Sequence, residues 1–260
     1  HGGTYPELHR EQAAQGIHLY SDWFGTSIWA DLGHVAPDRY DYSEYDRYFA
    51  TILEADPEAQ FLPHIGLAAP LWWQQAHPEE LTRYADGRSG PPSFASELWR
   101  QDMAADLRKL LKHLRRSPYA DRILGIIFYS GYTAEWQMWG TWQEHKDDYS
   151  APALRAFRAF LTRRYQTDAA LRRAWGDPQA SLATAALPDM AARRPAGVQV
   201  LRDPATEQRV IDFYEFINHL TAEAVCYFAR VTREATAGRG LVGTYYAYLS
   251  AHNQNQQDSG

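Results

Sequence analysis

Short apolar runs alternate with longer segments of helical spacing along this chain. Four apolar runs predict strands, at residues 17–23, 61–66, 123–129 and 241–248. Apolar residues at helical spacing predict helices near residues 6–15, 42–53, 98–114, 152–165 and 210–236. Because helices separate the strands, the pattern predicts a parallel α/β sheet with right-handed crossovers.

Local signals refine this outline. Asp41 or Ser43 can cap the second helix, and Pro152 suits the first turn of a later one. Turn residues predict a long loop at 74–96, and Ala, Pro and Arg predict an irregular segment at 177–204. We expect Cys226 to lie in the core, because the last long helix is rich in apolar residues.

Composition narrows the classes of function. The 260 residues are 45% hydrophobic, enough for one domain with a full core. A net charge of −6 argues against nucleic acid or an anionic membrane as partner, and no apolar run approaches the roughly 20 residues of a membrane span. The chain has a single cysteine and scattered histidines, so we expect no metal site. It also lacks the glycine-rich motifs that bind phosphates, so we expect no nucleotide cofactor.

The segment after the third predicted strand carries the strongest chemical signal. That strand stops at Ser130 and Gly131, and Glu135 follows among the aromatic residues Tyr132, Trp136, Trp139 and Trp142. Catalytic groups of α/β barrels lie just beyond strand ends. Apolar walls favour the protonated form of a carboxylic acid, and aromatic faces stack on sugar rings, so the pattern indicates a sugar-cleaving acid. The alternative is that Glu135 caps a helix or pairs with an arginine.

Five segments in order resemble the bacterial β-galactosidases related to glycoside hydrolase family 42. They are YDYSEYD at 40–46, PLWW at 70–73 with HPEEL at 77–81, GYTAEW at 131–136, FRAFL at 157–161 with LRRAWGD at 171–177, and VGTYYAYL at 242–249. The resemblance spans nearly the whole chain. One departure is Ala134, because many members have Asn before the acid/base, where it contacts the 2-hydroxyl of the substrate.

The resemblance implies an incomplete (β/α)8 TIM barrel that holds about strands two to five, in one partial catalytic domain over residues 1–260. It implies a retaining glycosidase acting on β-galactosides or related bonds. Glu135 is then the general acid/base, and the nucleophile carboxylate lies outside this chain. The chain begins with His1 and ends in a polar stretch, so we expect a piece of a longer protein, and its compartment, bacterial cytoplasm or outside the cell, stays open.

A carbohydrate is the expected partner, with sugar contacts at the strand ends. The candidates are Asp22, Trp23, His64, Trp72, Trp73, Tyr132, Trp136 and Tyr246. Alternatives stay open for several: Asp22 as a cap or ion-pair partner, His64 as a core histidine bonded to a backbone carbonyl, and one of Trp72 and Trp73 as a packing residue. If a helix follows Gly131, then Trp136, Trp139 and Trp142 share a face, which either borders the cleft or packs on the barrel. We expect Asp147 and Asp148 to be a solvated pair at a helix entry.

Two other classes of protein fit the same architecture. A carbohydrate-binding barrel without catalysis keeps the aromatic residues but lacks a nucleophile. An aldolase or a metal-dependent hydrolase wants a lysine or clustered ligands at strand ends, whereas Lys109, Lys112 and Lys146 lie in a predicted helix or loop. The sequence therefore favours the glycosidase, and it leaves the sugar, the linkage and the oligomeric state open.

Overall fold

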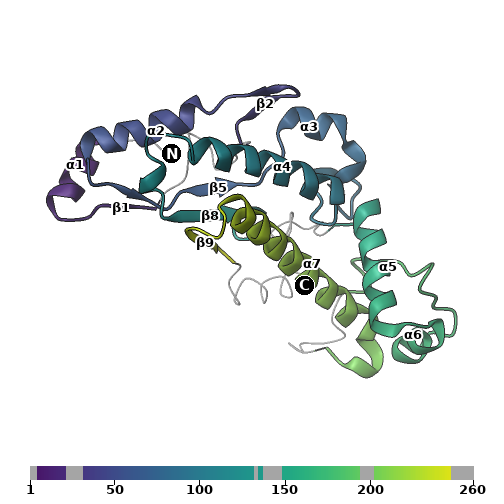
Figure 1. Ribbon diagram of the computed structural model, residues 1–260. Coiled ribbons are helices and arrows are strands. Elements are labelled where there is room, and N and C mark those ends of the chain that lie inside the picture. Colours follow the sequence, from purple (N-terminus) through teal and green to yellow (C-terminus); the bar gives the residue numbers. More distant parts are fainter. Residues whose placement is uncertain (1–4, 22–31, 132–133, 137–147, 194–201, 247–260) are drawn as a thin grey trace. The chain divides into compact units, whose positions relative to one another are not determined.

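The computed structural model describes residues 5–21, 32–131, 134–136, 148–193 and 202–246 (Figure 1). The chain forms two compact units. The first unit comprises residues 1–76, 100–136 and 225–246, and the second comprises residues 77–99, 137–224 and 247–260. Each unit is therefore described by itself.

Parallel strands form the centre of the first unit. β1 (Leu19–Tyr20) pairs with β4 (Gln60–Phe61), and β5 (His64–Gly66) pairs with β8 (Gly125–Tyr129). β9 (Leu241–Thr244) lies on the other side of β8, and all of these pairs are parallel. The predicted order and direction of the four strands are thus confirmed, although the last strand ends at Thr244 (Figure 1).

Pro63 divides the second predicted strand into β4 and β5. Proline has no N–H to donate to a neighbouring strand, so the regular ladder stops there. The hydrogen bonds around it continue nevertheless. The Leu62 N–H donates to the Tyr20 carbonyl at 2.9 Å, and the Pro63 carbonyl accepts from the Ile127 N–H at 2.9 Å. Both halves therefore act as one strand between β1 and β8.

The predicted helices are present with small shifts of their ends. They are α1 (Pro6–Ala14), α2 (Ser43–Ala55), α4 (Glu97–Leu114), α5 (Ala151–Tyr165) and α7 (Pro204–Ala235). A further short helix, α6 (Asp168–Trp175), follows α5. At the start of α2, Asp41 Oδ1 accepts a hydrogen bond from the Ser43 N–H at 2.9 Å. α7 begins earlier than predicted and is kinked at Glu207. No helix among the described residues has both the length and the apolar character needed to cross a bilayer.

Several local elements differ from the sequence prediction. The predicted loop at 74–96 contains the end of helix α3 (Leu71–Ala76), a 3-10 turn (Pro78–Glu80) and an antiparallel hairpin of β6 (Leu81–Arg83) and β7 (Ser89–Pro92). A second hairpin joins β2 (His34–Ala36) to β3 (Arg39–Tyr40), and another 3-10 turn spans Ala120–Arg122. These elements are too short to show hydrophobic periodicity.

Cys226 is exposed, so its predicted place in the core is wrong. The reason is its position on α7. Ala224 and Phe228 are fully buried, and each is two residues from Cys226. Two residues correspond to about 200° around a helix. Cys226 therefore lies on the face opposite to the buried one.

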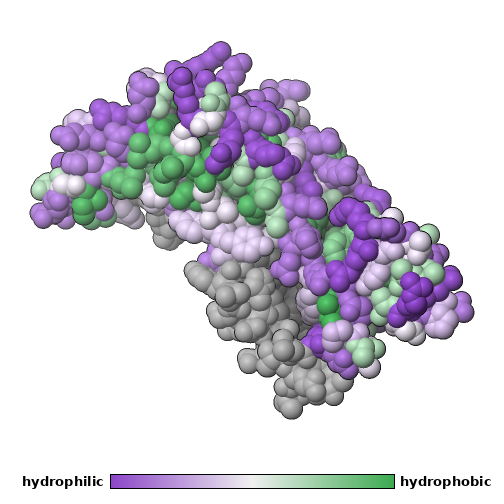
Figure 2. Space-filling model, turned by 60° about the horizontal axis from the view of Figure 1, so that its bottom comes forward, coloured by the Kyte–Doolittle hydropathy of each residue, from purple (hydrophilic) through white to green (hydrophobic). Residues whose placement is uncertain are grey.

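Each unit has its own apolar core. The first packs the side chains of α2, α4 and α7 around β4 and β8, including Phe49, Ile52, Phe61, Met103, Leu107, Phe128 and Phe228. The second packs α5 against the first part of α7, with Phe157 against Phe213 and Phe216. Figure 2 shows apolar surface on the first unit. The exposed apolar residues of this unit include Ile17, Leu19, Leu124 and Leu241, which lie near the starts of β1, β8 and β9.

Candidate active site

A closed turn follows β8 and carries Glu135. Its backbone takes left-handed φ angles at Gly131 (82°), Ala134 (65°) and Trp136 (58°). The Trp136 N–H donates to the Ser130 carbonyl at 2.8 Å, which fastens the turn to the end of the strand. Non-glycine residues adopt such angles at a cost of about 1–3 kcal/mol each, so surrounding contacts must hold them. Glu135 is thereby placed, half-buried, at the C-terminal end of β8.

The Trp136 side chain supplies those contacts. Its ring is buried against Phe128 of β8 and Phe228 of α7, with centroids 5.9 and 6.2 Å away. Its Nε1–H donates to Thr244 Oγ1 on β9 at 2.6 Å, and the same hydroxyl donates to the Phe128 carbonyl at 2.7 Å. The residue next to Glu135 is therefore attached to two strands and one helix.

This geometry corrects the prediction for the tryptophans after β8. Residues 134–136 are not helical, because two of the three have positive φ. Trp136 is 2% exposed, so its ring has no free face for a sugar and packs in the core instead. Trp139 and Trp142 lie outside the described residues, as does Tyr132.

A polar cluster joins the first residue of β5 to residues that directly follow two other strands. His64 of β5 is buried, and its Nε2 lies 2.9 Å from Ser21 Oγ and 3.3 Å from the Tyr245 hydroxyl. Ser21 follows β1 directly, and Tyr245 follows β9. Two hydrogen-bond partners of His64 are therefore side-chain hydroxyls of residues that follow β1 and β9.

Sequence reasoning did not find Ser21. For the end of the last strand it weighed Tyr246 and Tyr245 and took Tyr246 as the candidate, whereas Tyr245 makes the contact with His64. The signal available was position, because both residues directly follow a strand. Tyr246 itself is half-exposed, and its partial burial raises the pKa of its hydroxyl. Asp22 and Trp23 lie outside the described residues.

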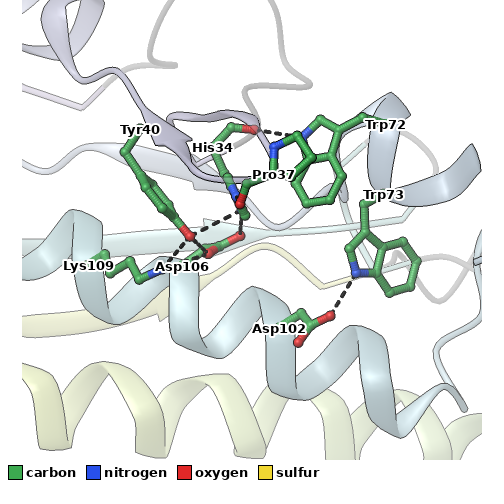
Figure 3. A network of polar contacts seen from close by, with 8 residues as sticks. All are labelled: His34, Pro37, Tyr40, Trp72, Trp73, Asp102, Asp106 and Lys109. Carbon is green, nitrogen blue, oxygen red and sulfur yellow. Dashed lines mark hydrogen bonds and ion pairs between the residues drawn. The ribbon is translucent and has the colours of Figure 1, made fainter. Parts of the chain in front are cut away.

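Trp72 and Trp73 both have structural partners on the first unit (Figure 3). Trp73 is buried, and its Nε1–H donates to Asp102 of α4 at 2.8 Å, so the predicted sugar contact of Trp73 is not supported. Trp72 is only partly buried. Its Nε1–H donates to the His34 carbonyl at 3.1 Å, and its ring lies edge-on to His34 with centroids 4.6 Å apart. Of Trp72 and Trp73, it is therefore Trp73 that packs in the core.

The same network fastens the β2–β3 hairpin to α4. Buried Asp106 accepts hydrogen bonds from the Tyr40 hydroxyl at 2.6 Å and from His34 Nδ1 at 2.8 Å (Figure 3). Burial and this bond to Asp106 together raise the pKa of Tyr40 above its ordinary value. Lys109 contacts the same hydroxyl and lies over the Tyr40 ring. These polar residues hold the structure around Trp72.

The structure corrects the prediction for one carboxylate, Asp148. It was predicted to be solvated, but it is 2% exposed in the second unit. It accepts hydrogen bonds from Ser93 Oγ at 2.5 Å, the Ser150 N–H at 2.9 Å and the Arg83 N–H at 3.3 Å. Burial raises the pKa of Asp148, and these bonds lower it by a smaller amount. Asp147 lies outside the described residues.

No cluster of three or more His, Cys, Asp or Glu side chains with the geometry of a metal site occurs within the ranges that the structure describes. The described residues offer the half-buried carboxylic acid of Glu135 beyond β8 and, separately, a buried histidine with two hydroxyl partners. Such a set can transfer protons and bind hydroxyl groups.

Comparison with known proteins decides the family. The model of glycoside hydrolase family 42, described as Beta-galactosidase, matches residues 24–242. The chain belongs to glycoside hydrolase family 42. A relative of this family 42 chain is the β-galactosidase BbgII of Bifidobacterium bifidum, 28% identical over 169 residues, which are 62% of this chain and 22% of BbgII.

Solved structures share the fold of this family 42 chain. The β-galactosidase of the psychrophilic Marinomonas ef1 aligns with a TM-score of 0.71 and 19% identity, over 97% of this chain and 37% of that one. The catalytic domain of the β-amylase of Paenibacillus polymyxa aligns with a TM-score of 0.71 and 15% identity, over 92% of this chain and 61% of that one. The fold is that of part of a TIM-barrel glycoside hydrolase, and the chain spans about a third or less of the β-galactosidases it matches.

Proposed function

We propose that the protein is a retaining glycosidase that hydrolyses β-galactosides or related glycosides. In this proposal Glu135 is the general acid/base, and a carboxylate from outside these 260 residues is the nucleophile. Membership of family 42 supports the reaction class. Because the chain covers only part of its relatives, the activity is assigned to the intact protein of which these residues form part of the barrel.

The observation that carries the proposal is the position of Glu135. It follows β8 at the C-terminal end of parallel strands, where catalytic groups of barrel enzymes lie. The strained turn and the anchored Trp136 hold its backbone in one place. A retaining mechanism needs a fixed acid, because the two carboxyl groups must stand about 5–5.5 Å apart across the bond that breaks.

The chemistry divides between two steps. Glu135 protonates the oxygen of the leaving group while the nucleophile attacks the sugar, and Glu135 then removes a proton from the water that releases the sugar. The His64 cluster, with Ser21 and Tyr245, supplies hydrogen-bonding groups near the same strand ends. We include Asp22, Trp23, Trp72, Tyr132 and Tyr246 as further candidates for contacts with the sugar.

Replacing Glu135 by Gln in the intact protein tests the assignment. Hydrolysis of galactosides with poor leaving groups should fall by several orders of magnitude, because their departure requires a proton. Activated aryl galactosides need little protonation, so their first step should change much less, and azide should restore turnover by replacing the activated water. The melting temperature should stay near that of the wild type.

Glu54→Gln is the matched control, since Glu54 is exposed on α2 and makes the same change of charge. It should leave both classes of substrate unaffected. A Glu135→Gln protein with full activity on poor leaving groups removes Glu135 from the mechanism. A wild-type protein that binds galactosides without hydrolysing them establishes the carbohydrate-binding alternative instead.

A further inference from the structure

The hydroxyl of Thr244 links two strands to the tryptophan that follows Glu135. Thr244 is the last residue of β9 and pairs in register with Phe128 of β8. Its hydroxyl donates its proton to the Phe128 carbonyl at 2.7 Å and accepts the Trp136 Nε1–H at 2.6 Å. The same hydroxyl also lies 3.2 Å from the Tyr245 carbonyl, so its oxygen is held between two carbonyl groups and the indole N–H.

We propose that Thr244 is a positioning residue for the acid/base, acting through Trp136. The inference rests on the proposed function of Glu135. Thr244 sets where the Trp136 ring lies, and the ring sets the backbone of the turn in which Glu135 stands. Thr244 itself does not touch the substrate in this scheme.

The physical reason lies in the strain of the turn. Trp136 has a φ of 58° and Ala134 a φ of 65°, which non-glycine residues adopt only when other contacts enforce them. The packing of Trp136 on Phe128 and Phe228 resists its removal from the core, but ring packing alone does not fix rotation within the pocket. The hydrogen bond to Thr244 is directional, so it selects one orientation.

This predicts a defect in proton donation, and not in binding. A displacement of about 1 Å in a catalytic group lowers the rate by up to about 100-fold. Thr244→Val has nearly the same shape, suits a strand and removes the acceptor. We expect it to lower kcat by about 10-fold for galactosides with poor leaving groups, because these depend on the acid. Activated aryl galactosides should change less than about 2-fold in the first step, and KM should stay within about 2-fold.

Four further variants make the test specific. Thr244→Ser keeps the hydroxyl and should retain wild-type kcat. Trp136→Phe keeps an aromatic ring but removes the donor, so it should repeat the leaving-group dependence of Thr244→Val, and the double variant should be no worse than either single one. Thr221→Val is the control, because the Thr221 hydroxyl also donates to a backbone carbonyl, that of Ile217 at 3.0 Å, but belongs to the second unit and not to the turn that carries Glu135.

The outcomes separate the two proposals. If Thr244→Val lowers the rates of all galactosides equally, or if Thr244→Ser fails to restore them, then Thr244 is only structural and the inference is overturned. If Glu135→Gln itself shows no dependence on the leaving group, then the assignment of the acid/base is overturned first. Leaving-group dependence in Glu135→Gln, Thr244→Val and Trp136→Phe, with none in Thr221→Val, supports both.

Discussion

Removing the Asp148 carboxylate should destabilise the protein far more than removing a solvent-exposed carboxylate at the start of a helix would. Asp148 holds three segments of the second unit together, since it accepts bonds from the hairpin residue Arg83, from Ser93 and from Ser150 at the start of α5. Asp148→Ala leaves two backbone N–H groups and one hydroxyl without this acceptor. Each unsatisfied buried group costs about 1–3 kcal/mol, so the free energy of unfolding should fall by at least about 3 kcal/mol.

Asp148→Asn separates the hydrogen bonds from the charge. The amide oxygen can still accept from the Ser150 and Arg83 N–H groups, and Ser93 Oγ can turn to accept from the new NH2 group. We therefore expect a loss of less than about 1 kcal/mol. The contrast between Ala and Asn measures how much of the stability comes from the acceptor geometry.

The pH dependence has a definite sign. Burial raises the pKa of Asp148 in the folded protein above its unfolded value of about 3.9. A group of this kind stabilises the fold fully below the unfolded pKa, and that stabilisation is lost as pH rises through the raised folded pKa. Asp148→Asn does not titrate, so its stability relative to the wild type should improve as pH rises above about 4.

Calorimetry of the intact protein and its variants checks these expectations. A loss of about 3 kcal/mol corresponds to a fall in Tm of roughly 6–12 °C for a domain of this size. The control is Asp177→Ala, because Asp177 accepts a backbone hydrogen bond from Gln179 on the exposed surface, where water replaces it. A Tm change below about 2 °C for Asp148→Ala would refute the structural role of Asp148.

Two further predictions concern glycine and cysteine. Gly125→Ala should destabilise the protein severely, because the added Cβ would lie 2.3 Å from the Leu241 carbonyl oxygen on β9. In Gly176→Ala the added Cβ meets no atom within 4 Å, so only the left-handed φ of 62° opposes it, and the loss of stability should be about 1–2 kcal/mol. Thermal unfolding of both variants tests this contrast, which equal losses would contradict. Cys226 should react with a thiol reagent in the folded protein, because it is exposed on α7. Peptide mass mapping after labelling of the folded protein measures this, and a Cys226 that is modified only after unfolding would contradict the prediction.

The sequence predicted the elements whose signals are local and long enough to repeat. The spacing of apolar residues in α4 and the apolar run before Ser130 each carry a period that belongs to one type of structure. Alternation of such elements then gave the parallel order of β1, β4–β5, β8 and β9. Short elements escaped this reasoning, because a strand of two to four residues such as β2 or β6 contains less than two periods.

The candidate site was found in part. Glu135 was identified because it lies just beyond a predicted strand end, and His64 because it lies within a predicted strand. The partners of His64 were not, since Tyr245 is 181 residues away and its contact depends on which of two adjacent tyrosines turns inward. The shared face of Trp136 and Trp139 depended on a helix after Gly131, and the positive φ of Trp136 shows that the chain is not helical there; of the two alternatives, Trp136 packs in the core.

By itself the sequence determined the strand and helix segments, the parallel arrangement and the resemblance to family 42, because these follow from periodicity and from motifs within short stretches. Only the tertiary structure decided which side chains are buried and what they touch. Asp148 became a buried acceptor for three segments, and Trp136 became an anchor on Thr244, 108 residues away. The physical reason is that burial and hydrogen bonding depend on neighbours brought together from distant parts of the chain, whereas periodicity depends on neighbours along it.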